Sequence, residues 1–146
     1  MKIAIGSDHA GYDMRLMLKD YLTSLGHTVE DMGCPDKSSC DYPVYGRKVA
    51  IGVKNGEFDR GVLICGTGFG ISLSANRISG IRCVNATDGL TVRLSRQHNN
   101  SNMIALGARI IGEDEAKFLV DIFLNTEHDG GRHSRRVELI DSLPTE

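Results

Sequence analysis

Short runs of hydrophobic residues alternate with longer amphipathic stretches along the chain. The short runs are four or five residues long and rich in β-branched side chains, which is typical of buried strands. The longer stretches place their apolar residues at helical spacing and several end at glycine or asparagine. The pattern predicts strands at 2–6, 28–32, 61–65, 81–84 and 102–106, and helices at 12–25, 44–53, 71–78, 88–98, 114–124 and 132–143.

This alternation predicts an α/β fold, because parallel strands need a long crossover connection between them, usually a helix. We expect a three-layer α/β/α, Rossmann-like domain with a five-stranded parallel sheet. The 146 residues hold no repeat or linker and fit one domain over 1–146. Ligands of such sheets bind at the carboxyl ends of the strands. The candidate site therefore lies among residues 6–9, 65–70, 84–88 and 106–109.

The composition is that of an ordinary globular protein, with 40% hydrophobic and 25% charged residues. A net charge of −2 disfavours nucleic-acid coating, and no apolar run approaches the length of a membrane span. The first eight residues already turn polar, unlike a signal peptide. We expect a cytoplasmic protein with no nucleic-acid or membrane partner.

Four cysteines are present, and their spacing matches neither a zinc ribbon, a Cys-x-x-Cys pair nor a dense disulfide framework. We expect reduced thiols in the cytoplasm. We interpret Cys34, Cys40 and Cys83 as incidental, whereas Cys65 lies directly before a glycine-rich loop.

The loop after the third predicted strand has glycine at 66, 68 and 70 and leads into a helix. Such a loop can direct successive backbone amides towards an anion, either a phosphate or a developing oxyanion. The alternative is a tight turn that merely requires glycine. The loop is not a Gly-x-Gly-x-x-Gly motif, and no Lys-Ser/Thr follows as in a P-loop, so nucleotide binding is weakly supported.

Cys65 has two roles left after elimination. The sixth residue after it is Ile71, not the arginine of a tyrosine phosphatase, and no partner cysteine follows closely. It is then either a buried spectator or a general base or nucleophile beside an oxyanion cradle. A cysteine that removed a proton next to a carbonyl would have its enediolate product stabilised by the same amides.

A basic cluster begins the last predicted helix, where Arg132, His133, Arg135 and Arg136 follow two glycines. Cations at a helix N-terminus oppose the helix dipole, which favours a visiting anion such as phosphate. The alternative is a solvated surface neutralised by neighbouring acids.

Four further polar residues stand at predicted helix and strand ends. Asp8 and His9 follow the first strand, His98 ends a helix, and Arg109 follows the fifth strand. Asp8 can simply cap a helix, and His98 is open between a structural role and proton transfer.

Six motifs in order resemble the family that contains ribose-5-phosphate isomerase B and the galactose-6-phosphate isomerase subunits. The resemblance extends from residue 1 to about 140. The motifs are SDHAG at 7–11, DYP at 41–43, CGTGFGIS at 65–72, ANR at 75–77, SRQHN at 95–99 and GGRH at 130–133.

The resemblance implies aldose–ketose isomerisation of a sugar phosphate, chiefly ribose 5-phosphate to ribulose 5-phosphate, without a metal or organic cofactor. It implies a homodimer, or a pair of dimers, with active sites at the interface and the helix at 132–143 packed on the partner subunit. Cys65 matches the base that moves a proton between C2 and C1, beside Thr67. His98 matches the acid/base that opens the sugar ring.

The resemblance also implies the positions that hold the substrate. Loop amides would cradle the enediolate, and other positions would contact the sugar hydroxyls or the phosphate. These residues are Asp8, His9, Gly66, Gly68, Phe69, Gly70, Asn99, Arg109, Arg132 and Arg136.

Two alternatives stay open. The stretch 84–90 differs from the ribose isomerases, so a hexose 6-phosphate such as allose or galactose 6-phosphate is a second candidate substrate. A non-catalytic sugar-phosphate-binding protein would use the same loop and arginines without exchanging the C2 hydrogen with solvent.

Overall fold

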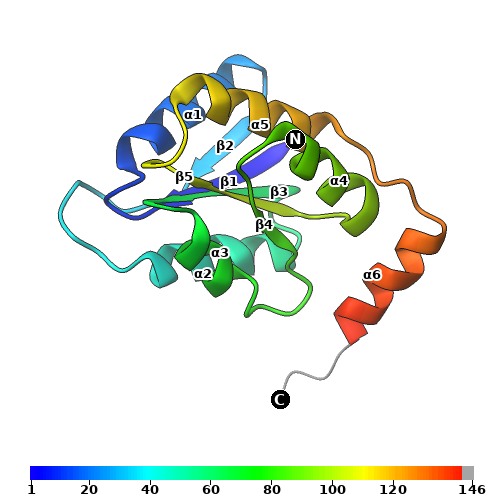
Figure 1. The fold of residues 1–146 in the computed structure, drawn as a ribbon. Coiled ribbons are helices and arrows are strands. Elements are labelled where there is room, and N and C mark those ends of the chain that lie inside the picture. Colours follow the sequence, from blue (N-terminus) through cyan, green and yellow to red (C-terminus); the bar gives the residue numbers. More distant parts are fainter. Residues whose placement is uncertain (143–146) are drawn as a thin grey trace.

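Five parallel strands form one sheet in the order β2-β1-β3-β5-β4 (Figure 1). The computed structural model describes residues 1–142, so residue 143, the predicted end of the last helix, lies outside it. The elements are β1 Lys2–Ser7, α1 Tyr12–Ser24, β2 Thr28–Asp31, α2 Tyr42–Lys54, β3 Arg60–Cys65, α3 Phe69–Ala75, β4 Cys83–Asn85, α4 Gly89–Asn99, β5 Met103–Gly107, α5 Glu113–Asn125 and α6 Arg132–Ser142.

Helices cover both faces of the sheet, which confirms the predicted three-layer α/β/α fold (Figure 1). Successive residues of a strand point to opposite faces, and β3 shows this clearly. Val62 and Ile64 face α1 and α5, whereas Leu63 and Cys65 face α2 and α3. The sheet is buried on both faces, which explains why the strands appear in the sequence as nearly continuous hydrophobic runs.

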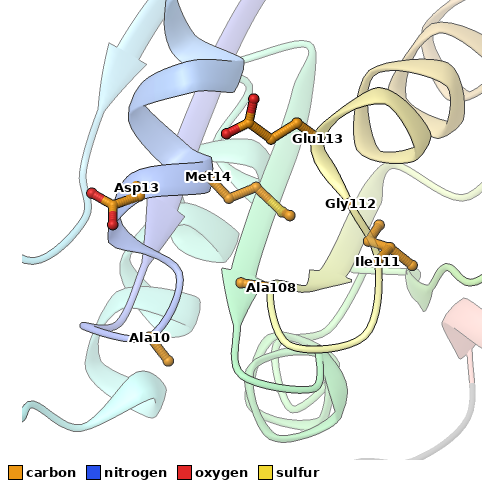
Figure 2. Close-up of a pocket in the computed structure, with 7 residues that line it drawn as sticks. All are labelled: Ala10, Asp13, Met14, Ala108, Ile111, Gly112 and Glu113. Carbon is orange, nitrogen blue, oxygen red and sulfur yellow. The ribbon is translucent and has the colours of Figure 1, made fainter.

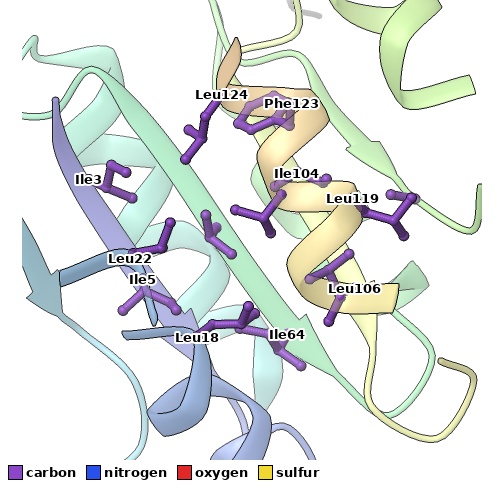
Figure 3. Packing of buried hydrophobic residues seen from close by; sticks show 14 of the residues in the cluster. Ile3, Ile5, Leu18, Leu22, Ile64, Ile104, Leu106, Leu119, Phe123 and Leu124 are labelled. Carbon is purple, nitrogen blue, oxygen red and sulfur yellow. The ribbon is translucent and has the colours of Figure 1, made fainter. Parts of the chain in front are cut away.

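The larger hydrophobic cluster lies between the sheet, α1 and α5 (Figure 3). Its central side chains are fully buried and come from strands and helices alike. The residues labelled in the figure are Ile3, Ile5, Leu18, Leu22, Ile64, Ile104, Leu106, Leu119, Phe123 and Leu124.

Every predicted helix and strand is present, and their ends lie within three residues of the predicted ones, with shifts of two or three residues at α2, β4 and α3. Strand β4 begins at Cys83 rather than at 81, because 78–81 forms a turn closed by the Ile81 N–H on the Ile78 carbonyl. Helix α3 begins at Phe69, immediately after the left-handed Gly68, and ends at Ala75. The glycine loop is therefore shorter than its sequence suggests, and its last residues already belong to a helix.

The strand order changes direction between β1 and β3, which is where ligands bind in open parallel sheets. Ser7 at the end of β1 pairs with Ile64, one residue before the end of β3. The segments that follow these two strands therefore leave the sheet side by side. These are the segments that carry Asp8 and His9 on one side and Cys65 on the other.

Helix α6 stands apart from the sheet at the side of the molecule (Figure 1). It contacts α4, and His133 and Val137 are its buried residues. An ion pair between Arg82 and Asp141, with Nη1 2.8 Å from each carboxylate oxygen, fixes its far end. Within residues 1–142, none of the helices has the length and hydropathy needed to cross a membrane.

Ile104→Ala tests the central packing. Ile104 is fully buried in β5, so we expect the free energy of unfolding to fall by about 2–5 kcal/mol through lost burial and a residual cavity. The measurement is urea denaturation. Leu25→Ala, at a residue that is 51% exposed, is the control and should change stability by less than about 0.5 kcal/mol. Equal losses in the two variants would contradict this core assignment.

Candidate active site

The predicted site residues fall into two groups, one beyond the carboxyl ends of the strands and one beyond their amino ends. One group follows the carboxyl ends of β1, β3 and β5, and the other stands at the end of α4 and the start of α6. The first group is Asp8, His9, Cys65, Gly66, Thr67, Gly68, Phe69, Gly70 and Arg109, and the second is His98, Asn99, Arg132 and Arg136.

The Cys65 thiol accepts a hydrogen bond from the backbone N–H of Gly68, with 3.1 Å between nitrogen and sulfur. An N–H donor aimed at sulfur stabilises the thiolate more than the thiol, as does the N-terminus of α3 nearby. Cys65 is only 4% exposed in the single chain, and it lines neither of the two cavities described below. Its sulfur thus receives a backbone donor but is nearly covered by its own loop.

Gly68 is required by both conformation and space, whereas Gly70 is limited by space alone. Gly68 has φ +82°, and a Cβ there would lie 2.0 Å from Asn85 Oδ1. A Cβ on Gly70 would lie 2.5 Å from the ring of Tyr42. The loop is therefore pressed between the end of β4 and the start of α2, which fixes the direction of its amides.

Asn85 is a polar residue that the sequence interpretation did not single out. Its Oδ1 is buried, has no hydrogen-bond partner within the described chain, and faces Gly68. Asn85 belongs to the stretch 84–90, and this stretch, noted for its divergence, was the one signal in the sequence that could have pointed to the residue. It brings that stretch into contact with the glycine loop.

Positive charge stands directly beside the loop. The Arg109 N–H donates to the Gly66 carbonyl at 3.0 Å, and the guanidinium lies over Gly66, with Nη1 3.3 Å from where a Cβ would be. Thr67 Oγ1 accepts from the N–H of Phe69 at 3.4 Å. The Phe69 side chain is 61% exposed, so its backbone, not its ring, belongs to the loop structure.

Asp8 and His9 are both held by backbone donors. Asp8 Oδ1 accepts from the N–H groups of Ala10 and Gly11 at 3.0 and 3.1 Å, which closes the turn before α1. His9 Nδ1 accepts the Cys40 N–H at 3.2 Å, and this bond assigns the proton to Nε2. Asp8 thus closes the turn that precedes α1 but does not cap the helix, whose N-cap is Gly11 without a side-chain hydrogen bond, and His9 presents a donor.

The second group lies at the amino ends of the strands. The Asn99 carbonyl accepts from Arg82 Nε at 3.1 Å, and Arg82 directly precedes β4. Helix α4 starts at the opposite edge, where the Asp88 carboxylate caps it by accepting the Thr91 N–H at 2.9 Å. Since α4 has 11 residues, it separates its two ends by roughly 16 Å.

One chain therefore does not bring Cys65 and His98 together. In a parallel sheet all strands end on one side, and each crossover helix runs back and ends on the side where the strands begin. A site that used both residues needs two copies of the chain.

Arg96 is a second residue without a predicted role, and it fixes the end of α4. It is 2% exposed, donates to the carbonyls of Thr126 and Ser101, and its Nη1 donates to Asn100 Oδ1 at 2.9 Å. Burial lowers the pKa of Arg96 to about 10, which leaves it charged at neutral pH. The position of His98 depends on this anchor.

His98 and His133 stack with ring centroids 4.3 Å apart and planes inclined by 4°. Together with Asp129 they offer ligand atoms within 4.8 Å of one another. Imidazole lone pairs lie in the ring plane, so two parallel rings direct them within two separate parallel planes that do not meet at one ion. Stacking therefore suits neutral imidazoles better than a chelated ion, and the absence of a metal from the chemistry stays a prediction.

A cavity of about 290 Å³ opens between α1 and α5 (Figure 2). It lies on the face of the sheet opposite to the one that the Cys65 side chain occupies. None of the predicted site residues lines it, although Ala10 and Ala108 adjoin His9 and Arg109. The Glu113 carboxylate on its wall would repel a phosphate, and the Asp13 carboxylate is paired with Lys37 at 2.7 Å. A second cavity of about 130 Å³ adjoins Asn85.

Comparison with known proteins gives a consistent result. The family model described as ribose/galactose isomerase matches residues 3–140. Ribose-5-phosphate isomerase B of Escherichia coli is 44% identical over 97% of this chain and 95% of its own. The galactose-6-phosphate isomerase subunit LacB of Clostridium acetobutylicum is 39% identical over 94% and 79%. The solved structure of Clostridium thermocellum ribose-5-phosphate isomerase B superimposes with a TM-score of 0.95 at 49% identity over 97% and 95%.

The histidine stack predicts a pH dependence of stability. Desolvation, then the charges of His98, Arg132 and Arg136, lowers the pKa of His133 below its ordinary 6.5. Neutral His133 contributes fully to the free energy of unfolding above pH 6.5. This contribution is lost as the pH falls below 6.5 towards the folded-state pKa, because the unfolded chain binds the proton first.

We therefore expect the urea midpoint to fall between pH 7 and pH 5, and to fall less in His133→Gln. Identical pH profiles for the two proteins would contradict the assignment.

Proposed function

Since this chain belongs to the ribose/galactose isomerase family, we propose that it interconverts an aldose phosphate and its ketose, with ribose 5-phosphate as the preferred substrate. The observation that carries the proposal is the Gly68 N–H on the Cys65 sulfur, at the switch point between β1 and β3. It combines a base with an amide cradle where ligands of such sheets bind. Residues 1–146 serve as one catalytic domain, placed in the cytoplasm.

Cys65 moves the proton in the proposed reaction. Its thiolate removes the proton from C2 of the open-chain aldose, and the negative charge moves onto the carbonyl oxygen at C1. Backbone amides of Gly66 to Gly70 stabilise this enediolate. A proton then moves from the C2 hydroxyl to the C1 oxygen, which places the negative charge on the C2 oxygen. The thiol returns its proton to C1, C2 becomes the carbonyl carbon of the ketose, and the thiolate is restored. The steps involve proton transfer alone, so we expect no metal or cofactor.

Ring opening and phosphate binding complete the site with a second copy of the chain. His98 of that copy opens the ring by giving a proton to the ring oxygen and removing the proton of the C1 hydroxyl. Asn99 of that copy contacts the sugar. Asp8 contacts a hydroxyl on the Cys65 side. Guanidinium groups bind phosphate well through paired donors. The phosphate-side residues are His9, Arg109, Arg132 and Arg136.

The exposed apolar residues support a homodimer, alone or paired into a tetramer. Phe69 and Leu73 are 61% and 68% exposed on α3, next to the loop, and Leu139 and Ile140 are half-exposed on α6. Exposed apolar side chains grouped on two outlying helices are typical of an interface. Helix α6, which stands away from its own sheet, would pack on the partner.

A hexose 6-phosphate is the second candidate substrate. The stretch 84–90 touches the glycine loop through Asn85 and Gly68, so its residues would form part of the wall beside the proposed substrate. The relative from Clostridium acetobutylicum is named for galactose 6-phosphate. Neither nucleic acid nor a membrane enters this proposal.

Cys65→Ser tests the base. We expect kcat on ribose 5-phosphate to fall by about 10²–10⁴-fold or more, because a serine hydroxyl is a far weaker base, while the urea midpoint changes little. Cys83→Ala is the control at a buried cysteine outside the loop.

The measurement is a coupled assay over ribose 5-phosphate, allose 6-phosphate and galactose 6-phosphate, with C2 hydrogen exchange followed in deuterated water. Retained activity in Cys65→Ser would remove this residue from the mechanism. Wild-type binding without any C2 exchange would instead identify a non-catalytic binding protein.

Mixing two inactive variants tests the shared site. Homodimers of Cys65→Ser and of His98→Gln should each be inactive. A mixed dimer, purified through two different tags, keeps both residues in one of its two sites and should recover about half of the wild-type activity. An inactive mixed dimer would show that the two residues do not act across the interface.

A further inference from the structure

The loop between β2 and α2 holds two cysteines six residues apart, and the fold places them together. Cys34 is 1% exposed, and its N–H donates to the Ser7 carbonyl at 3.0 Å. Cys40 is partly exposed. Its N–H donates to Nδ1 of His9, two residues beyond Ser7, at 3.2 Å. The loop therefore returns to the turn after β1, and this turn holds both cysteines by their backbone N–H groups.

A buried arginine stands against the first of these thiols. Arg15 is 3% exposed, its Nη1 lies 3.6 Å from Cys34 Sγ, and its Nη2 donates to the Cys34 carbonyl at 2.8 Å. The Nε lies 3.1 Å from Asp31 Oδ1, which holds the side chain in place. A guanidinium beside a sulfur stabilises the thiolate in the transition state of thiol chemistry.

A histidine stands against the second thiol. Cys40 Sγ lies 3.9 Å from Nδ1 of His9, the nitrogen that accepts the Cys40 N–H. The Cys40 N–H occupies the lone pair of this nitrogen in the assigned tautomer, so the imidazole is fixed beside the Cys40 thiol. The pair thus has a fixed cation on one side and an imidazole on the other.

We propose that Cys34 and Cys40 form an oxidisable dithiol that a peroxide converts into an intramolecular disulfide. In the first step the Cys40 sulfur attacks one peroxide oxygen, the O–O bond breaks, and Cys40 sulfenic acid and water form. In the second step the Cys34 sulfur attacks the sulfenic sulfur, the S–S bond forms, and a second water leaves. The two thiols lose two electrons, which reduce the peroxide.

Exposure decides the order of the two steps. Cys40 is the thiol that a peroxide reaches, whereas burial and the neighbouring Cys40 raise the pKa of Cys34. Cys34 therefore reacts second, within the loop, where the high local concentration compensates for its burial. The remaining cysteines differ from this pair, since Cys65 receives a backbone amide and burial raises the pKa of Cys83.

The disulfide would act on the candidate site through two contacts. Cys40 holds His9 through its backbone N–H, and Tyr42, two residues later, lies against Gly70. Drawing Cys40 towards Cys34 changes both contacts. We expect oxidation to raise KM for the sugar phosphate, whereas disulfide formation itself does not depend on the proposed reaction.

Peptide mapping after peroxide treatment tests the proposal. The full-length protein is treated with hydrogen peroxide, blocked with iodoacetamide and digested with trypsin without reduction. Cleavage after Lys37 separates the two cysteines, so the disulfide joins peptides 20–37 and 38–47. We expect this linked pair at a mass two hydrogens below the sum of its parts, with its loss on reduction. Under denaturing conditions two of the four thiols disappear.

Cys40→Ser and Cys34→Ser are the matched variants, and Cys65→Ser removes the site thiol from the count. We expect the linked pair in wild type and in Cys65→Ser, and in neither variant of the pair. Absence of the linked peptides in wild type would overturn the proposal. So would a link from Cys40 to Cys40 of another chain, or peroxide addition to Cys40 that stops at a sulfinic acid.

Discussion

The direction of the strands constrains everything that this chain can do chemically. All five strands end at one edge, so the glycine loop, Asp8 and Arg109 meet there, and every crossover helix must end at the other edge. His98 therefore lies a full helix away from Cys65, and no change of rotamer can bridge that separation. The same constraint leaves only half of the proposed site on one chain, and in the proposed dimer the other half comes from the partner together with helix α6.

Two buried arginines hold the loops from which each half-site projects. Arg15 donates hydrogen bonds to the carbonyl of Cys34 and to the hydroxyl of Ser7. Arg96 donates to the carbonyls of Ser101, after α4, and Thr126, after α5. A buried guanidinium is costly unless its donors are paired, so each arginine imposes one geometry on the backbone around it. Neither touches a reacting atom in the proposed mechanism. Both act as positioning residues, and both lie outside the residues that a search for chemistry along the strand ends would select.

Hydrophobic periodicity was sufficient to predict the strands, the helices and the three layers, because each is a local pattern with a buried face. The loop at 65–70 was predictable as well, since its glycines and its cysteine follow a buried strand directly. Periodicity could not predict that Asn85 presses on Gly68, or that the turn at 78–81 delays β4, because both depend on tertiary contacts. It also could not show that Asp8 uses an oxygen to close its own turn while His9 faces Cys40.

The four cysteines illustrate why spacing along a chain is a poor guide to thiol chemistry. Cys34 and Cys40 match no redox motif, yet the loop between them folds back so that an arginine and a histidine flank the two sulfurs. Cys83 is equally buried but meets apolar neighbours, and burial raises its pKa. Cys65 differs from all three in facing a backbone amide, a donor that cannot move or titrate. In the proposed mechanism the fixed amide suits a thiolate that gains and then gives up a proton in every turnover, whereas the polar neighbours of Cys34 and Cys40 suit the proposed oxidation, in which each thiol reacts once and is later reduced.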